Sequence, residues 1–186
     1  MTKVVKLNVN ERIIDKDDEN ENWIATYTLY KDVENISEIH QKLVNGELEA
    51  AIINPCLIAD LFQITIAVNK AIRLNLLNKM KTKNVFTEII YNLSPDRKIA
   101  QALKTFGIDD KLNALLVVTI CPETHYKTED ETLSEIINGT ICSIEDLELF
   151  TNEELLKKIY KLTDAEVKHG SIVNSIVGRM ALKDVL

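Results

Sequence analysis

Apolar and polar residues alternate near the start of the chain, where Val5, Leu7 and Val9 are separated by charged or polar residues. This period of two is typical of a strand with one buried face, and it predicts a strand over residues 3–9. Residues 23–30, WIATYTLY, are rich in β-branched and aromatic residues and predict a second strand. We expect the two strands to form an antiparallel pair.

Short apolar runs predict further strands. Residues 50–53 and residues 114–120 are continuously apolar or nearly so, which is the pattern of a strand buried on both faces of a sheet. Residues 85–91 are also rich in strand-forming types, and residues 140–144 suggest a short edge strand. The chain is therefore expected to contain several strands separated by helices.

The strongest helix signal lies between these strands. Asn54 can cap a helix with its side-chain oxygen, and Pro55 fits the first turn, where a missing N–H costs nothing. Apolar residues then recur at helical spacing as far as Leu77, which predicts a helix of roughly twenty residues. Phe62 and Leu74 make its other side apolar as well, so we expect a long central helix that is covered nearly all round.

Helical patterns with start or stop signals occur elsewhere. They cover residues 37–46, 94–107, 131–137, 153–162 and 163–182. The last one opens with a capping box, Thr163 to Glu166. Helices interleaved with strands predict an α+β (mixed α/β) fold, with a mostly antiparallel mixed sheet flanked by helices, in a single domain over residues 1–186.

The last predicted helix carries two stripes of side chains. The apolar stripe contains Ile172, Val173, Ile176, Val177 and Met180. A stripe of small residues beside it contains Ser171, Ser175 and Gly178. Packing on the protein's own core and docking of a partner are both compatible with this pattern.

Charge is distributed unevenly. The chain has 22 basic and 29 acidic residues and a net charge of −7. Residues 70–104 carry eight basic and two acidic groups, which gives +6, so the other residues sum to −13. The basic segment could contact a polyanion, or it could be a solvated face beside the central helix.

The sequence contains no strong signature of catalysis. It has no phosphate-binding glycine loop and no nucleophile elbow, and its three histidines and three cysteines are widely separated. We therefore predict no enzyme active site, no metal and no cofactor. The start of the chain also lacks a signal-peptide core, and no apolar run is long enough to cross a membrane. The expected location is the cytosol and nucleus, with no membrane contact.

Several segments resemble one known family. They are Ile53-Asn-Pro55, Ala67-Val-Asn-Lys-Ala71, Lys79-Met-Lys-Thr-Lys83, the segment Thr87 to Pro95, the segment Ala102 to Ile108, Lys158-Ile-Tyr-Lys-Leu162 and the tail Arg179 to Leu186. They resemble the kinase-binding subunits of the KEOPS (EKC) complex, whose animal members are called TPRKB. The resemblance runs from about Trp23 to the end of the chain and is weak before it.

The resemblance implies a specific role. Members of this family are not enzymes; they bind the small lobe of the atypical kinase/ATPase PRPK. PRPK contacts OSGEP, the subunit that transfers a threonylcarbamoyl group to an adenosine beside the tRNA anticodon, and archaeal relatives are similar to a tRNA-recruiting part. The fold that it implies is a mixed sheet flanked by helices.

Two sets of residues follow from the sequence and the resemblance together. The kinase-binding set is Ile172, Val173, Ile176, Val177 and Met180. The tRNA-binding set is Lys79, Lys81, Lys83, Arg97 and Lys98, which would contact phosphates. The alternative is a stand-alone tRNA- or RNA-binding module without a kinase partner. A stand-alone enzyme would need a constellation of catalytic residues that the sequence does not display.

Overall fold

A single antiparallel sheet organises the computed structural model, which describes residues 2–6 and 23–183. Its strands in these ranges are β1 (Lys3–Lys6), β2 (Trp23–Lys31), β3 (Ala51–Ile53), β4 (Ala114–Pro122) and β5 (Thr140–Cys142). The order is β1-β2-β4-β3, and β5 pairs with β2 next to β1. The predicted antiparallel pair, the two buried strands and the edge strand are confirmed. The remainder of the first predicted strand, residues 7–9, lies outside the described residues.

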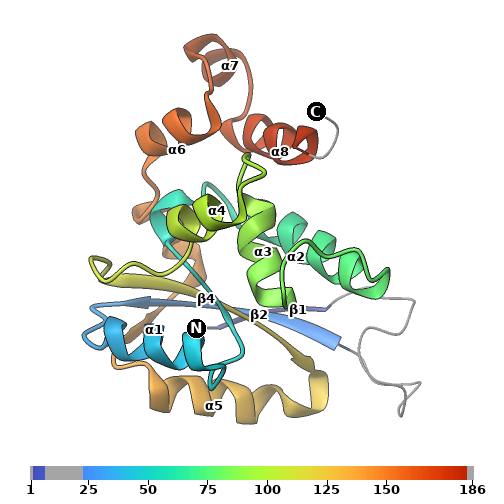
Figure 1. Ribbon diagram of the computed structural model, residues 1–186. Coiled ribbons are helices and arrows are strands. Elements are labelled where there is room, and N and C mark those ends of the chain that lie inside the picture. Colours follow the sequence, from blue (N-terminus) through green and yellow to red (C-terminus); the bar gives the residue numbers. More distant parts are fainter. Residues whose placement is uncertain (1, 7–22, 184–186) are drawn as a thin grey trace.

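One face of the sheet packs against α2 (Leu61–Leu76) and α3 (Val85–Leu93). Tyr27 and Leu29 from β2, with Leu116 and Val118 from β4, point to this face and are fully buried. In Figure 1 the two helices lie side by side above the sheet. This side holds the larger of two clusters of buried apolar residues.

The opposite face is covered by α1 (Ile36–Asn45) and α5 (Tyr126–Ile136), which lie below the sheet in Figure 1. Side chains that alternate with the first set, such as Tyr30 and Val117, form a second cluster there with Ile39 and Leu133. Helices on both faces of an antiparallel sheet confirm the predicted α+β fold.

The C-terminal part of the chain adds α6 (Glu153–Tyr160), α7 (Asp164–His169) and α8 (Ile172–Leu182). They gather at one end of the molecule in Figure 1, beyond α4 (Ile99–Phe106). Short 3₁₀ turns lie at Pro55–Leu57, Glu123–His125 and Ile144–Leu149. No helix within the described ranges is both long and apolar enough to cross a membrane.

The predicted start of the central helix was wrong. Asn54 caps only the 3₁₀ turn Pro55–Leu57, and α2 begins at Leu61 with Asp60 as its cap. The reason is that Gln63 binds the intervening backbone: its Nε2 donates to the Leu57 carbonyl at 3.2 Å, and its Oε1 accepts from the amide of residue 59 at 2.9 Å. The helix is also not covered all round, because the Phe62 side chain is 53% exposed.

The predicted strand over residues 85–91 was also wrong, because this segment is helix α3. Asn84 caps the helix, accepting a 2.8 Å hydrogen bond from the Thr87 amide. Glu88 through Leu93 are all buried, so tertiary burial overrides the preference of β-branched residues for strands.

Three other boundaries differ from the predictions. Helix α4 begins at Ile99 instead of Ser94, because the Ser94 hydroxyl accepts from the Asp96 amide in a turn. Helix α5 begins at Tyr126 instead of residue 131. The last helix is two helices, α7 and α8, separated by Gly170 in an extended conformation.

Candidate functional site

Helix α8 carries the residues predicted to bind a kinase, and the structure divides them. Ile176 and Met180 are 0% and 3% exposed and belong to the main core. Ile172 packs partly against the same core. Val173 and Val177 are half-buried. Each follows a residue of the core-facing stripe, Ile172 or Ile176, so both lie beside that stripe on the helix surface. On the free protein, the partly accessible members of the predicted set are therefore Ile172, Val173 and Val177, and of these Ile172 packs against the core, which leaves Val173 and Val177 as the outer edge.

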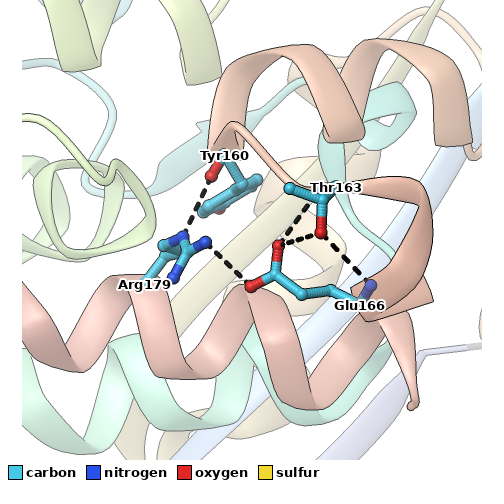
Figure 2. Close-up of polar contacts among 4 residues, drawn as sticks. All are labelled: Tyr160, Thr163, Glu166 and Arg179. Carbon is cyan, nitrogen blue, oxygen red and sulfur yellow. Dashed lines mark hydrogen bonds and ion pairs between the residues drawn. The ribbon is translucent and has the colours of Figure 1, made fainter. Parts of the chain in front are cut away.

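An ion pair holds α7 against α8 (Figure 2). The Arg179 guanidinium donates from Nη2 to Glu166 Oε1 at 2.8 Å and from Nε to the Tyr160 carbonyl at 3.3 Å. The other Glu166 oxygen accepts from the amide and the hydroxyl of Thr163, which completes the predicted capping box. These two hydrogen bonds, and then Arg179, lower the pKa of Glu166 below its ordinary value.

This ion pair also explains why one predicted helix is two. Residues 166 and 179 would lie about 20 Å apart along a continuous helix, at 1.5 Å per residue. A 2.8 Å contact between Glu166 and Arg179 therefore requires the chain to turn back at Gly170.

Tyr160 connects the C-terminal helices to the core. Its hydroxyl donates to the Leu93 carbonyl at 2.6 Å and accepts from Gln63 Nε2 at 3.0 Å. Its ring meets that of Phe106 edge-on, with centroids 6.0 Å apart. Burial raises the pKa of the Tyr160 hydroxyl well above its ordinary value, so it remains a neutral donor. These contacts join the end of α6 to α2 and α3, and so fix the point in space at which the chain continues into α7 and α8.

The residues predicted to bind tRNA are all exposed, but they form two groups. Lys79, Lys81 and Lys83 lie in the loop before α3, which we call the basic loop (residues 79–83). Arg97 and Lys98 follow the other end of α3. A nine-residue helix separates the groups by roughly 13 Å. This spacing fits a ligand with several phosphates better than a single phosphate group.

Arg97 connects the second basic group to α8. Its Nε donates to the Lys183 carbonyl oxygen at 2.7 Å. Lys183 is 4% exposed, and its ammonium group donates to the Tyr91 carbonyl and lies 3.3 Å from the centroid of the Tyr91 ring. The structure thus brings one basic group next to the end of the predicted kinase-binding helix.

Glu88 is a residue that the sequence analysis did not single out. It is fully buried in α3, and its carboxylate accepts hydrogen bonds from the basic loop. A single charge inside the otherwise uncharged and largely apolar run VFTEIIYNL was the available signal. The incorrect strand prediction concealed it, because a strand would have placed every second residue on a solvated face.

A groove of about 370 Å³ lies between α1, α3 and α4. Apolar side chains that line it include Leu43, Val44, Phe86, Ile90 and Leu103. None of the ten predicted site residues lines this groove. Within the described ranges, no group of three or more His, Cys, Asp or Glu side chains could hold a metal ion.

Comparison with known proteins identifies the family. Residues 30–184 match the model of a family described as kinase binding protein CGI-121. This chain belongs to the CGI-121 family. The match includes the basic loop, Glu88 and all of α8, so these features lie within the part that defines the family.

Curated CGI-121 relatives are named as subunits of one complex. A Danio rerio protein named EKC/KEOPS complex subunit TPRKB is 40% identical over 166 residues, which are 88% of this chain and 93% of that protein. A Coccidioides immitis protein named EKC/KEOPS complex subunit CGI121 is 33% identical, covering 72% and 67% of the two chains. The Schizosaccharomyces pombe subunit of the same name is 29% identical, covering 81% and 90%. The resemblance noted in the sequence is confirmed.

Proposed function

We propose that this chain is a non-catalytic subunit of an EKC/KEOPS complex, in which it binds an atypical kinase/ATPase of the PRPK type. Through that kinase and an OSGEP-type subunit it would support threonylcarbamoyl-adenosine modification of tRNA. The observation that carries the proposal is the half-buried apolar edge of α8, Val173 and Val177, in a chain of a kinase-binding family. The partner subunits would supply the catalytic residues, and the complex would work in the cytosol and nucleus.

The architecture of α8 supports docking at this edge. Ile176 and Met180 anchor the helix in the core, and Arg179 connects it to α7. The helix is therefore fixed before a partner arrives, and little conformational entropy is lost when it docks. Apolar side chains on a rigid helix face suit a groove between elements of a partner.

A second activity, tRNA binding, is proposed for the two basic groups at the ends of α3. All five side chains are exposed, in a chain whose residues outside 70–104 carry a net charge of −13. Lysine and arginine contacts to phosphates fix a nucleic acid without reading its sequence. We therefore propose that tRNA contacts the two exposed basic groups at the ends of α3, and that the kinase binds the neighbouring edge of α8.

Calorimetric titration of the purified chain with a PRPK-type kinase tests the proposal. We expect one-to-one binding, and we expect Val177→Lys to abolish or strongly weaken it while the melting temperature stays close to that of the parent. Val44→Lys is the matched control, because Val44 is 75% exposed on α1, which covers the opposite face of the sheet. If both variants lose the same amount of kinase affinity, or if Val177→Lys loses none, the kinase does not bind at the Val173 and Val177 edge of α8.

Titrating the same purified chain with tRNA distinguishes this proposal from the alternative, a stand-alone RNA-binding module. A folded chain that binds tRNA but shows no heat with the kinase would be a stand-alone RNA-binding module. A chain that binds both would fill the proposed role. The salt dependence of the tRNA affinity would count phosphate contacts, since each contact changes the logarithmic slope by about 0.7 to 0.9.

A further inference from the structure

The basic loop is held from beneath by one carboxylate. Glu88 Oε2 accepts hydrogen bonds from the amide of Lys81 at 2.9 Å and from the amide of Thr82 at 2.8 Å. The Thr82 hydroxyl lies 2.7 Å from the same oxygen. Glu88 is 0% exposed, and its Oε1 has no hydrogen-bond partner among the residues that the structure describes. Three donors from two consecutive residues thus converge on a single buried oxygen.

This arrangement determines which way the loop residues point. Thr82 is half-buried because its hydroxyl and amide turn toward Glu88. The residues on either side, Lys81 and Lys83, are exposed. The carboxylate therefore selects the register in which both lysine side chains face outward.

A buried carboxylate needs strong compensation. Removing a charge from water is costly unless hydrogen bonds and local dipoles replace the hydration that is lost. Glu88 lies in the first turn of α3, where the helix dipole favours a negative group, and its bonds to Lys81 and Thr82 are charge-assisted. The carboxylate and the loop backbone stabilise each other, so the conformation of the loop depends on Glu88.

We infer that Glu88 is a positioning residue for RNA binding: it fixes the backbone of the basic loop so that Lys81 and Lys83 are presented to a phosphate backbone before the RNA arrives. This inference rests on the proposed contact between the loop and tRNA. Preorganisation lowers the entropic cost of ordering the loop on binding. Removing it should weaken RNA binding although the residue itself touches no RNA.

Electrostatic attraction alone predicts stronger RNA binding when Glu88 is neutralised, which is the opposite of what a positioning role predicts. The sign of the change in affinity therefore distinguishes the two. Glu88→Gln removes a negative charge beside three lysines, and simple attraction to phosphate would then increase. If Glu88 positions the loop, the same substitution should weaken the affinity for an unmodified tRNA transcript by roughly ten-fold. Glu135→Gln on α5 is the matched control, because it makes the same change in charge at an exposed position on the other face of the sheet.

Amide hydrogen exchange gives a direct structural readout. The Lys81 and Thr82 amides should exchange faster in Glu88→Gln than in the parent, while amides in β4 remain protected. Thr82→Val is the second variant in case Glu88→Gln does not fold; it removes one donor at a half-buried position and should act in the same direction with a smaller effect. Kinase binding should be unchanged in both variants.

Lys81→Gln combined with Lys83→Gln distinguishes the two possible failures. If this double variant binds tRNA as tightly as the parent, the proposed RNA contact of the loop is wrong and the inference falls with it. If the double variant binds more weakly but Glu88→Gln and Thr82→Val bind as tightly as the parent or more tightly, the contact stands and the positioning role is overturned. Weaker binding by all three, with faster exchange in the loop, supports both.

Discussion

Arg97 donates a 2.7 Å hydrogen bond from its Nε to the main-chain carbonyl of Lys183, which joins the segment between α3 and α4 to the end of α8. The carbonyl groups at the end of a helix lack partners within the helix, and an arginine supplies one here. The arginine that we assign to RNA binding therefore also stabilises the helix that we assign to kinase binding. The two proposed surfaces share a structural support.

Arg97→Gln and Lys98→Gln separate these two roles. Both remove one positive charge, but only Arg97→Gln removes the bond to Lys183. We expect Arg97→Gln to lower the free energy of unfolding by about 1 kcal/mol, the usual net value of such a bond, and Lys98→Gln to leave it nearly unchanged. Denaturant titration measures the difference. Equal stabilities would show that the bond contributes nothing in solution.

Tyr160→Phe tests the buried connection between α6 and α3. The substitution leaves the Leu93 carbonyl without its 2.6 Å donor in the core, and we expect a loss of about 1–3 kcal/mol. Because Gln63 shares this network, Gln63→Leu and Tyr160→Phe should not be additive. A double-mutant cycle measured by chemical denaturation checks this. Strict additivity would mean that the two side chains do not interact.

Replacing two of the glycines by alanine should change the stability of the chain in opposite directions. A Cβ at Gly178, in the middle of α8, would meet no atom of the described residues within 4 Å, so Gly178→Ala should stabilise the free chain by up to about 1 kcal/mol through helix propensity. A Cβ at Gly107, at the end of α4, would lie 2.5 Å from the Leu103 carbonyl oxygen. We therefore expect Gly107→Ala to destabilise the chain by about 1–3 kcal/mol.

Thermal unfolding measures both glycine variants. Gly178→Ala also probes the stripe of small residues: if a partner's backbone approaches there, the variant will melt at a higher temperature yet bind the kinase more weakly. Unchanged kinase affinity would leave the edge of α8 at Val173 and Val177 as the contact and exclude close approach at Gly178.

The lowered pKa of Glu166 predicts a dependence of stability on pH. A carboxyl group whose pKa is depressed in the folded state stabilises the fold at pH values above its ordinary pKa, which is 4.5 here. This contribution is lost as the pH falls from that value through the lower folded pKa, because the protonated group accepts more weakly from Thr163 and no longer forms an ion pair with Arg179. The melting temperatures of the parent and Glu166→Gln should therefore differ at neutral pH and converge as the pH falls through the lowered pKa of Glu166. A difference that is constant with pH would contradict this.

Local signals in the sequence were sufficient for much of the fold. Alternation and continuous apolar runs located the strands, because a strand's side chains alternate whatever its neighbours are. Gly46 ends α1 in the left-handed conformation, and Asn152 and Thr163 cap α6 and α7, as their types predicted. These signals depend on contacts within a few residues, so the sequence displays them directly.

Tertiary contacts decided the rest. Residues 85–91 have the composition of a strand, but the surrounding elements bury Glu88 through Tyr91, and burial outweighs a propensity that amounts to about 1 kcal/mol at most. Pairing of Glu166 with Arg179, far along the chain, accompanies the break of the last helix at Gly170. The Glu88 carboxylate reaches the amides of the basic loop from the first turn of α3, so this contact exists only because residues 85–93 form a helix. By itself the sequence located the five described strands of the sheet, the capping box of α7 and the family. Which side chains of α8 are core, that residues 85–93 form a helix, and what holds the basic loop follow from contacts between distant residues that no local pattern encodes.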